Sequence, residues 1–235
     1  MTQRQYWLVV PAAGIGQRMQ ADRPKQYLQL RQRYILDITL SRLLDTGLFA
    51  GAMVPLHPDD RWFVGSDSAS DARILTCTGG GDRSDSVLSG LDALAGRLSD
   101  DDWVLVHDVA RPCVAAEDIR RLIVGLGEGD IGGLLAAPVS DTIKRQAADA
   151  DSVSETVDRR ALWRAFTPQQ FRYGLLRTAL GRARDRGVAV TDESSALEAM
   201  GYAPKLVRGR TDNIKITVPE DLPLAGWILD QLEHK

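Results

Sequence analysis

A loop of small residues flanked by cations lies near the N-terminus of the chain. An apolar run at 7–10 leads into Pro11, Ala12, Ala13, Gly14, Ile15 and Gly16, and the cations Arg18 and Lys25 follow. When such a loop comes directly after a parallel strand, its backbone N–H groups can approach an anion at the carboxyl edge of the sheet. Because the two cations can also neutralise charge, the combination indicates a site for a triphosphate that takes part in a transfer reaction.

Two widespread phosphate motifs do not fit this loop. The dinucleotide-binding pattern G-x-G-x-x-G/A requires a small residue where this chain has Met19, and the P-loop requires a Gly-Lys-Ser/Thr run that the segment lacks. For the glycines alone, a tight turn with solvated basic residues is an equal alternative. Only five of the 29 basic residues are lysines, which favours a specific role for Lys25.

A second glycine-rich segment spans residues 79–86. It reads Gly-Gly-Gly-Asp-Arg-Ser-Asp-Ser, between an apolar run and a helical pattern. Its backbone donors could meet a ligand, although helix capping by Asp82 or Ser84 would explain the shape equally well. Capping leaves Arg83 and Ser86 without a role, so both remain candidate ligand contacts.

An aspartate, Asp108, directly follows the apolar run at 103–107. A carboxylate at the carboxyl edge of a parallel sheet, beside a triphosphate loop, is well placed to hold Mg²⁺. For an isolated aspartate, capping of the next helix would be the commoner role. The predicted proximity of the first loop favours the metal site.

Buried strands and helices alternate through the first 139 residues. Apolar residues at helical spacing predict helices at 35–44, from Asp82 onward and after Pro112. Runs that are apolar on both faces predict strands at 7–10, 52–56, 73–77, 103–107 and 132–139. This alternation predicts an α/β fold in which helices cover both faces of a mostly parallel sheet.

The alternation ends after residue 139. Two short β-like pieces surround a turn-prone stretch in the polar segment 140–158, which predicts a protruding hairpin arm with too few large apolar residues for its own core. Beyond it the sequence predicts helices at 173–186 and 193–200, a strand at 205–208 and a last helix that starts at Pro219. We therefore expect one domain over 1–235, with 140–158 as an arm.

Composition excludes several classes of protein. The 235 residues are 44% hydrophobic with a formal charge of −3, which disfavours a broad nucleic-acid surface. No run approaches the ~18 apolar residues that a membrane span needs, and neither a signal peptide, a disulfide framework nor a zinc site is indicated. A cytoplasmic protein is expected.

Four separated motifs together resemble one known family. They are Ala-Ala-Gly-x-Gly-x-Arg-Met with the later Pro-Lys-Gln, the segment at 79–86, His-Asp-Val-Ala-Arg-Pro at 107–112, and Asp-Asn-Ile-Lys-Ile-Thr at 212–217. The chain resembles the nucleotidyltransferases that join an NTP-derived nucleotide to a sugar or polyol phosphate, and within them the 2-C-methyl-D-erythritol 4-phosphate cytidylyltransferases. The resemblance covers nearly the whole chain. It implies a Rossmann-like sheet, Mg²⁺ as cofactor, and transfer of CMP from CTP to the polyol phosphate in the non-mevalonate isoprenoid precursor pathway, with pyrophosphate as the second product.

The resemblance also assigns roles to residues of the sheet edge. Arg18, Lys25 and Lys215 are implied as catalytic cations, and Asp108 as the residue that contacts the metal and the ribose. Nucleotide contacts are implied for Pro11, Ala12, Ala13, Gly14, Gly16, Gly80, Gly81, Arg83 and Ser86. In this chain Gly81 and Val109 are mild departures from the family pattern.

Polyol phosphate contacts are implied for Arg111, Thr167 and Lys215, and less firmly for Thr191. In the family the arm crosses a homodimer, which would bring Thr142 and Arg159 to the substrate of the partner subunit. A solvated hairpin is the ordinary alternative for these two residues. For Thr191, helix capping is the alternative.

Three competing functions follow from the same residues. A ribitol 5-phosphate cytidylyltransferase would have the same build, and physical argument alone does not separate the two polyols. An NAD(P)-dependent oxidoreductase is disfavoured by Met19 and by the cations around the loop. A nucleotide sensor without catalytic activity would not need Lys25, Asp108 and Lys215 together.

Overall fold

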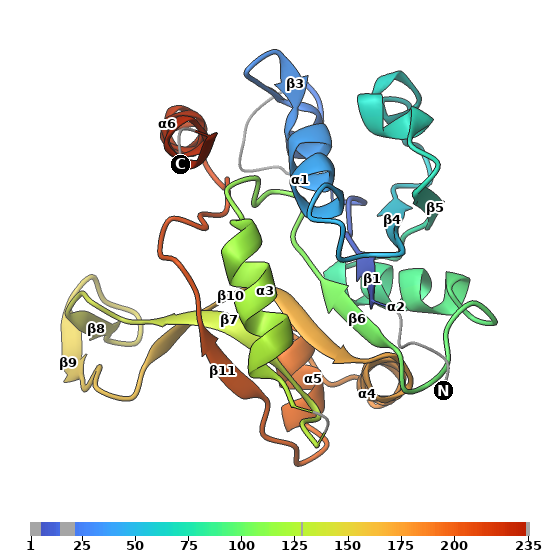
Figure 1. The fold of residues 1–235 in the computed structure, drawn as a ribbon. Coiled ribbons are helices and arrows are strands. Elements are labelled where there is room, and N and C mark those ends of the chain that lie inside the picture. The colour runs from blue at the N-terminus through green and yellow to red at the C-terminus, as the bar shows by residue number, and fades with distance from the viewer. Residues whose placement is uncertain (1–5, 15–21, 128, 234–235) are drawn as a thin grey trace.

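A seven-stranded sheet forms the centre of the computed structural model, which describes residues 6–14, 22–127 and 129–233 (Figure 1). Across the sheet the strand order is β11-β7-β10-β6-β1-β4-β5. Every neighbouring pair is parallel except those of β10, which runs antiparallel to β6 and to β7. The strands are β1 (Tyr6–Val9), β4 (Gly51–Leu56), β5 (Ile74–Thr78), β6 (Trp103–Val106), β7 (Gly132–Pro138), β10 (Trp163–Arg172) and β11 (Lys205–Arg208).

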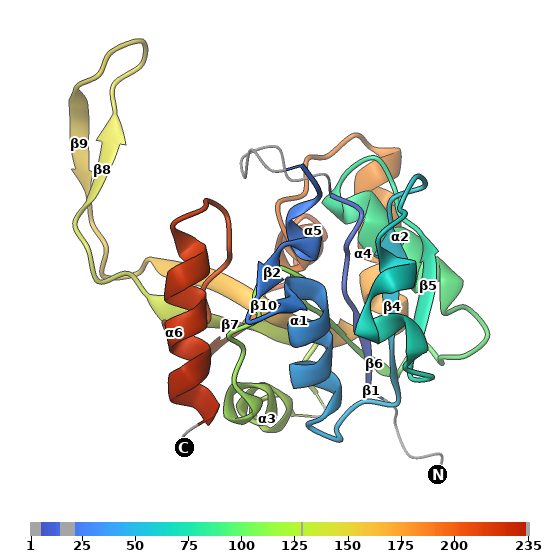
Figure 2. The ribbon, with the colours of Figure 1, turned by 90° about the horizontal axis from the view of Figure 1, so that it is seen from above.

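Each face of the sheet carries its own hydrophobic core. Side chains alternate along a strand, so Leu8 of β1 joins one core while Trp7 and Val9 join the other. Helices α1 (Ile35–Leu44) and α3 (Ala116–Gly125) cover the first face; α2 (Arg83–Ala93), α4 (Tyr173–Asp185) and α5 (Glu193–Glu198) cover the second (Figure 2). Burial on both faces explains why these strands are apolar throughout.

The last helix, α6 (Asp221–Glu233), packs outside the first layer. Its Ala225, Ile228 and Leu229 form a third core with Ile35 and Ile38 of α1. A short 3₁₀ turn, η2 (Lys25–Tyr27), leads into the two-residue strands β2 (Gln29–Leu30) and β3 (Arg33–Tyr34) beneath this helix; two more 3₁₀ turns, η3 (Phe63–Gly65) and η4 (Asp67–Ser70), precede β5.

The predicted arm is a two-stranded hairpin. Strands β8 (Ile143–Gln146) and β9 (Val153–Val157) pair with each other and with no strand of the main sheet. The hairpin projects away from the body of the molecule (Figure 2). Most of its residues are exposed, as the polar composition of 140–158 predicts.

The sequence predictions agree with most elements and differ at several. The helix at 35–44 and the strand at 205–208 have the predicted bounds, whereas the helix predicted at 193–200 ends at Glu198. The last helix starts at Asp221, not at Pro219, because the carbonyl groups of Val218 and Pro219 accept hydrogen bonds from residues three positions later and so form a turn before the helix.

Strand β10 is the strand of the main sheet that the sequence analysis missed, along with the short strands β2 and β3 outside that sheet. Pro168, Gln169 and Gln170 interrupt the apolar pattern, and proline ordinarily argues against a central strand. The structure tolerates Pro168 because the pairing of β10 with β7 shifts register between Ala165 and Gln169, so no ladder hydrogen bond is required there. Trp163, at the start of this strand, is 38% exposed.

None of the helices within 6–14, 22–127 and 129–233 combines the length and the apolar character that crossing a membrane requires.

Candidate functional site

The first loop and the glycine-rich segment meet at the carboxyl edge of the sheet. Residues 11–14 leave β1, and residues 79–82 leave β5 for the start of α2. A Cβ atom on Gly79 would lie 2.6 Å from Cβ of Ala13, so only glycine permits this approach of the two loops. Between them lies a pocket of about 200 Å³.

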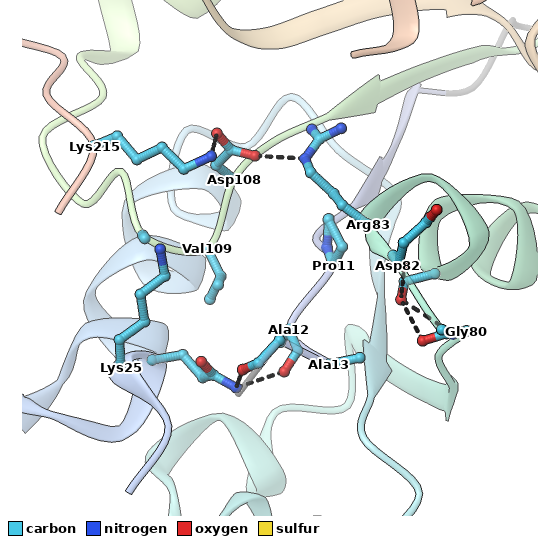
Figure 3. Close-up of a pocket in the computed structure, with 15 residues that line it drawn as sticks. Pro11, Ala12, Ala13, Lys25, Gly80, Asp82, Arg83, Asp108, Val109 and Lys215 are labelled. Atoms are coloured by element: carbon cyan, nitrogen blue, oxygen red, sulfur yellow. Dashed lines mark hydrogen bonds and ion pairs between the residues drawn. The ribbon is translucent and has the colours of Figure 1, made fainter. Parts of the chain in front are cut away.

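Most residues predicted to bind nucleotide line this pocket (Figure 3). The sequence analysis named Pro11, Ala12, Ala13, Gly14, Lys25, Gly80, Gly81, Arg83, Ser86, Asp108 and Lys215, and all of them are present. Gly16 and Arg18 lie outside the described residues. The lining also includes Gln26, Asp82, Val109 and Ala110, for which the sequence analysis proposed no contact.

Asp108 stands at the centre of a cluster of cations. Its Oδ1 accepts from Nε of Arg83 at 2.8 Å, and its Oδ2 lies 2.9 Å from Nζ of Lys215 and 3.3 Å from Nε of Arg111. The Asp108 side chain is only 9% exposed. Figure 3 shows the Lys215–Asp108–Arg83 chain along the pocket wall.

These ion pairs determine the protonation of the site. Burial alone would raise the pKa of the Asp108 carboxyl, but Arg83, Lys215 and Arg111 together hold it far below its ordinary value. Asp108 is therefore ionised at neutral pH. The predicted helix-capping alternative does not apply, since the Asp108 side chain makes these ion pairs instead.

A second pocket, of about 280 Å³, lies on the other side of this cluster. Three residues, Arg83, Asp108 and Lys215, line both pockets. The second pocket also contains the predicted polyol phosphate contacts Arg111, Thr167 and Thr191, together with Ala165, Phe166, Gln169 and Asp192. Capping of α5 is performed by Asp192 rather than by Thr191.

A buried histidine braces the turn that carries Asp108 and Arg111. His107 has no exposed surface; its Nε2 lies 3.1 Å from the backbone oxygen of Arg111, and its Nδ1 lies 3.1 Å from Oγ1 of Thr167. Thr167 in turn accepts from the Asp108 backbone N–H at 3.0 Å. A neutral ring that donates from Nε2 and accepts at Nδ1 satisfies every contact. Burial lowers the pKa of His107 to about 4, which is consistent with that form.

The segment 212–217 contacts residues of both pockets through its backbone atoms. Lys25 donates to the backbone oxygen of Ile216 at 3.3 Å, and the Ile216 N–H donates to Ala110 at 2.8 Å. Arg111 donates to the Asn213 backbone oxygen at 2.7 Å. The two predicted catalytic lysines thus face one site from different parts of the chain.

Two predicted substrate contacts are not brought to the site of their own chain. Thr142 and Arg159 lie at the base of the arm, are exposed and line neither pocket. The Arg159 guanidinium instead donates to the Ser140 backbone oxygen.

Three buried residues in or behind the site were missed. The Gln26 amide donates to backbone oxygens of Ala12 at 2.6 Å and Gly14 at 3.2 Å, and so holds the first loop in place. Glu193 binds Arg83, and His107 braces the turn. Each stands within or beside a motif already singled out, but nothing in the sequence shows that its side chain points inward.

The Asp108 carboxylate suits a divalent cation whose other ligands come mostly from the substrates. Among residues 6–14, 22–127 and 129–233 there is no group of three or more His, Cys, Asp or Glu side chains that could hold a metal by themselves. Mg²⁺ commonly keeps several waters and binds one or two carboxylates plus substrate phosphates. One ionised carboxylate beside a phosphate pocket fits that pattern, and Asp108 would be the ligand.

Backbone donors at the edge of a parallel sheet, flanked by lysines and bordered by a second cationic pocket, are features that fit a nucleotidyltransferase. The model of the family IspD, 2-C-methyl-D-erythritol 4-phosphate cytidylyltransferase, matches residues 6–231. The chain belongs to this family.

Relatives and solved structures agree with this assignment. The 2-C-methyl-D-erythritol 4-phosphate cytidylyltransferase of Ectopseudomonas mendocina is 54% identical over 225 residues, which cover 95% of this chain and 94% of the relative. The Francisella tularensis enzyme of the same name has a crystal structure with 35% identity and a TM-score of 0.81, covering 95% of this chain and 99% of that one. A crystal structure of 4-diphosphocytidyl-2C-methyl-D-erythritol synthase has 34% identity and a TM-score of 0.84, covering 98% and 100%.

The buried His107 should make stability depend on pH. Because its pKa is about 4 in the folded chain and about 6.5 when unfolded, the unfolded state binds the extra proton first. Stability is therefore present above pH 6.5 and falls as the pH drops from 6.5 to 4, by about 3 kcal/mol in total. Urea unfolding across this range, without nucleotide, measures the loss.

The matched control is the partly exposed His57. His107→Gln should flatten the slope between pH 6.5 and 4, and the same measurement on His57→Gln controls for the loss of a histidine from the surface. Parallel slopes for wild type and His107→Gln would show that His107 is not the titrating group.

Proposed function

We propose that this chain transfers CMP from CTP to 2-C-methyl-D-erythritol 4-phosphate, giving CDP-methylerythritol and pyrophosphate, with residues 1–235 acting as one nucleotidyltransferase domain and 140–158 as its arm. The observation that carries the proposal is the wall shared by the two pockets. Arg83, Asp108 and Lys215 border both, so a nucleotide in one and a phosphate monoester in the other would meet across a cationic boundary.

The chemical difficulty of this reaction is the approach of two anions. A phosphate monoester has a second pKa of about 6, so the nucleophile is largely a dianion at neutral pH and needs no general base. His107, buried and neutral, is not required for proton transfer. The protein must instead neutralise charge and position the two reactants.

The roles divide between the two pockets. In the first, residues 11–14 and 80–81 would contact the triphosphate, with the N–H groups of Ala13, Gly14 and Gly81 as donors, and Lys25 would neutralise charge on it. In the second, Arg111 and Lys215 would hold the incoming phosphate, with Thr167 and Thr191 beside the polyol. Arg18 and Gly16, outside the described residues, are proposed to complete the first loop.

Mg²⁺ is proposed as the cofactor, with Asp108 as its protein ligand. When bound, the cation would neutralise charge on the phosphate oxygens as the α-phosphorus is attacked. Both carboxylate oxygens of Asp108 already receive cations, so a metal ligand role requires Lys215 or an arginine to turn toward phosphate. The incoming phosphates supply the acceptors for that exchange.

The arm is proposed to act across a homodimer. Thr142 and Arg159 do not line the pockets of their own chain, and a lone two-stranded hairpin is only marginally stable in water. A second copy of the chain would supply the packing surface, cover Val153 and Trp163, which are 59% and 38% exposed, and receive Arg159 at its polyol phosphate.

Pyrophosphate release from CTP tests the function directly. With Mg²⁺, we expect rapid release with 2-C-methyl-D-erythritol 4-phosphate, and little with ribitol 5-phosphate, because the close relatives carry the name of the former substrate. A clear preference for ribitol 5-phosphate would show that this polyol phosphate is the substrate in place of the proposed one. Release with neither would refute the proposed function.

Lys25→Ala should lower kcat by about 10²–10³-fold, because a preorganised charge contact of the transition state is lost. The melting temperature should change little, since Lys25 lies in a 3₁₀ turn outside the three hydrophobic cores. Lys205→Ala, at a surface strand with an ion pair to Asp130, is the control and should keep full activity. A folded Lys25→Ala with normal kcat would remove Lys25 from the mechanism.

Mixing two inactive variants tests the arm. In a heterodimer of Arg159→Ala and Lys25→Ala subunits, one site combines an intact Lys25 with an intact Arg159 from the partner. Random subunit exchange should therefore restore about a quarter of all sites. Mass spectrometry of mixed dimers confirms exchange, and no recovery after confirmed exchange would contradict the exchanged arm.

A further inference from the structure

A buried carboxylate behind the site has no part in the mechanism described so far. Glu193 is the first residue of α5, and its side chain is only 1% exposed. Its Oε1 accepts from Nη1 of Arg83 at 2.7 Å, and its Oε2 accepts from Nη2 at 3.1 Å. This two-point contact fixes the plane of the guanidinium as well as its position.

Arg83 is therefore shared between two carboxylates from distant parts of the chain. Its Nε donates to Asp108 at 2.8 Å, while both terminal nitrogens donate to Glu193. The second N–H of each terminal nitrogen is left for other acceptors, and Arg83 borders both pockets. Glu193 thus decides which edge of the guanidinium faces Asp108 and which donors face the ligands.

Without Glu193, Arg83 could pair with Asp108 in a different way that would impair the site. An arginine free of Glu193 can pair with a carboxylate through two parallel hydrogen bonds. Arg83 would then occupy Asp108 with two donors, where at present only Nε reaches it. Asp108 would be less able to release a cation when phosphates arrive, and the donors of Arg83 would turn away from the pockets.

We infer that Glu193 is a positioning residue, which holds the Arg83 guanidinium in a single-contact pairing with Asp108 and so keeps both side chains available to the nucleotide. Thr191 and Asp192, immediately before it, line the second pocket, so the start of α5 lies beside that pocket as well as behind Arg83. The inference rests on the proposed function and concerns how that function is maintained.

The test compares Glu193→Gln with Glu198→Gln. Both residues lie on α5, but Glu198 is exposed, accepts a hydrogen bond from Ser194 and lines neither pocket. Glutamine keeps the size of the side chain and removes its charge. We expect Glu193→Gln to lower kcat/KM for CTP by about 10–100-fold, as is common for residues that orient a functional group, and Glu198→Gln to behave as wild type.

A double mutant separates positioning from simple stabilisation. If Glu193 acts through Arg83, then Glu193→Gln should cost no further activity in an Arg83→Gln background. The double variant also removes the unpaired buried charge that Arg83→Gln alone would leave, so it should melt at a higher temperature than Arg83→Gln. It therefore supplies a folded protein even if a single variant unfolds.

The outcomes are distinct. Full kcat/KM for CTP in folded Glu193→Gln would overturn the inference. So would a loss from Glu193→Gln in the Arg83→Gln background that equals its loss in the wild-type background. In both cases an active wild-type enzyme would still uphold the proposed function. An inactive wild-type chain would refute the proposed function and this inference with it.

Discussion

The site depends on one buried carboxylate that is surrounded by cations. Asp108 offsets the mutual repulsion of Arg83, Arg111 and Lys215, which could not otherwise gather within hydrogen-bond distance of one point. Three cationic partners, and not one, offset the free-energy cost of burying the charge of Asp108. The same arrangement keeps positive charge concentrated at the boundary between the two pockets. A phosphate that entered either pocket would compete with Asp108 for those cations, so its binding would weaken the ion pairs of Asp108.

The α/β architecture explains why these side chains meet. β1 and β6 are neighbours, so the loops that follow them emerge together at the carboxyl edge of the sheet. The segment 212–217, near the C-terminal end of the sequence, is held at the same edge by a backbone hydrogen bond from the Ile216 N–H to the Ala110 oxygen. The Lys215 side chain therefore reaches the same place. The two hydrophobic cores below fix the strands, and the loops share that rigidity because Ala12 and Val109 are themselves part of one of these cores.

The fold was largely predictable because buried parallel strands are apolar on both faces and the intervening helices are amphipathic. β10 was not predictable in this way, since Pro168 and two glutamines enter the sheet at a register shift that only the pairing with β7 creates. Strand-end motifs likewise identified Asp108, Lys25 and Arg83. Glu193 and His107 escaped because a charged or polar residue beside a motif is usually solvated, and their burial results from contacts with segments far away in the sequence.

The antiparallel direction of β10 has a consequence for how the arm can change. β7 ends, and β10 begins, at the carboxyl edge of the parallel strands, so the intervening hairpin needs no crossover connection (Figure 1). Insertions at its tip, between β8 and β9, would extend its reach without shifting any rung of the central sheet. A change in the length of this tip can therefore alter what the arm reaches, while the central sheet and the two pockets at its edge keep their geometry.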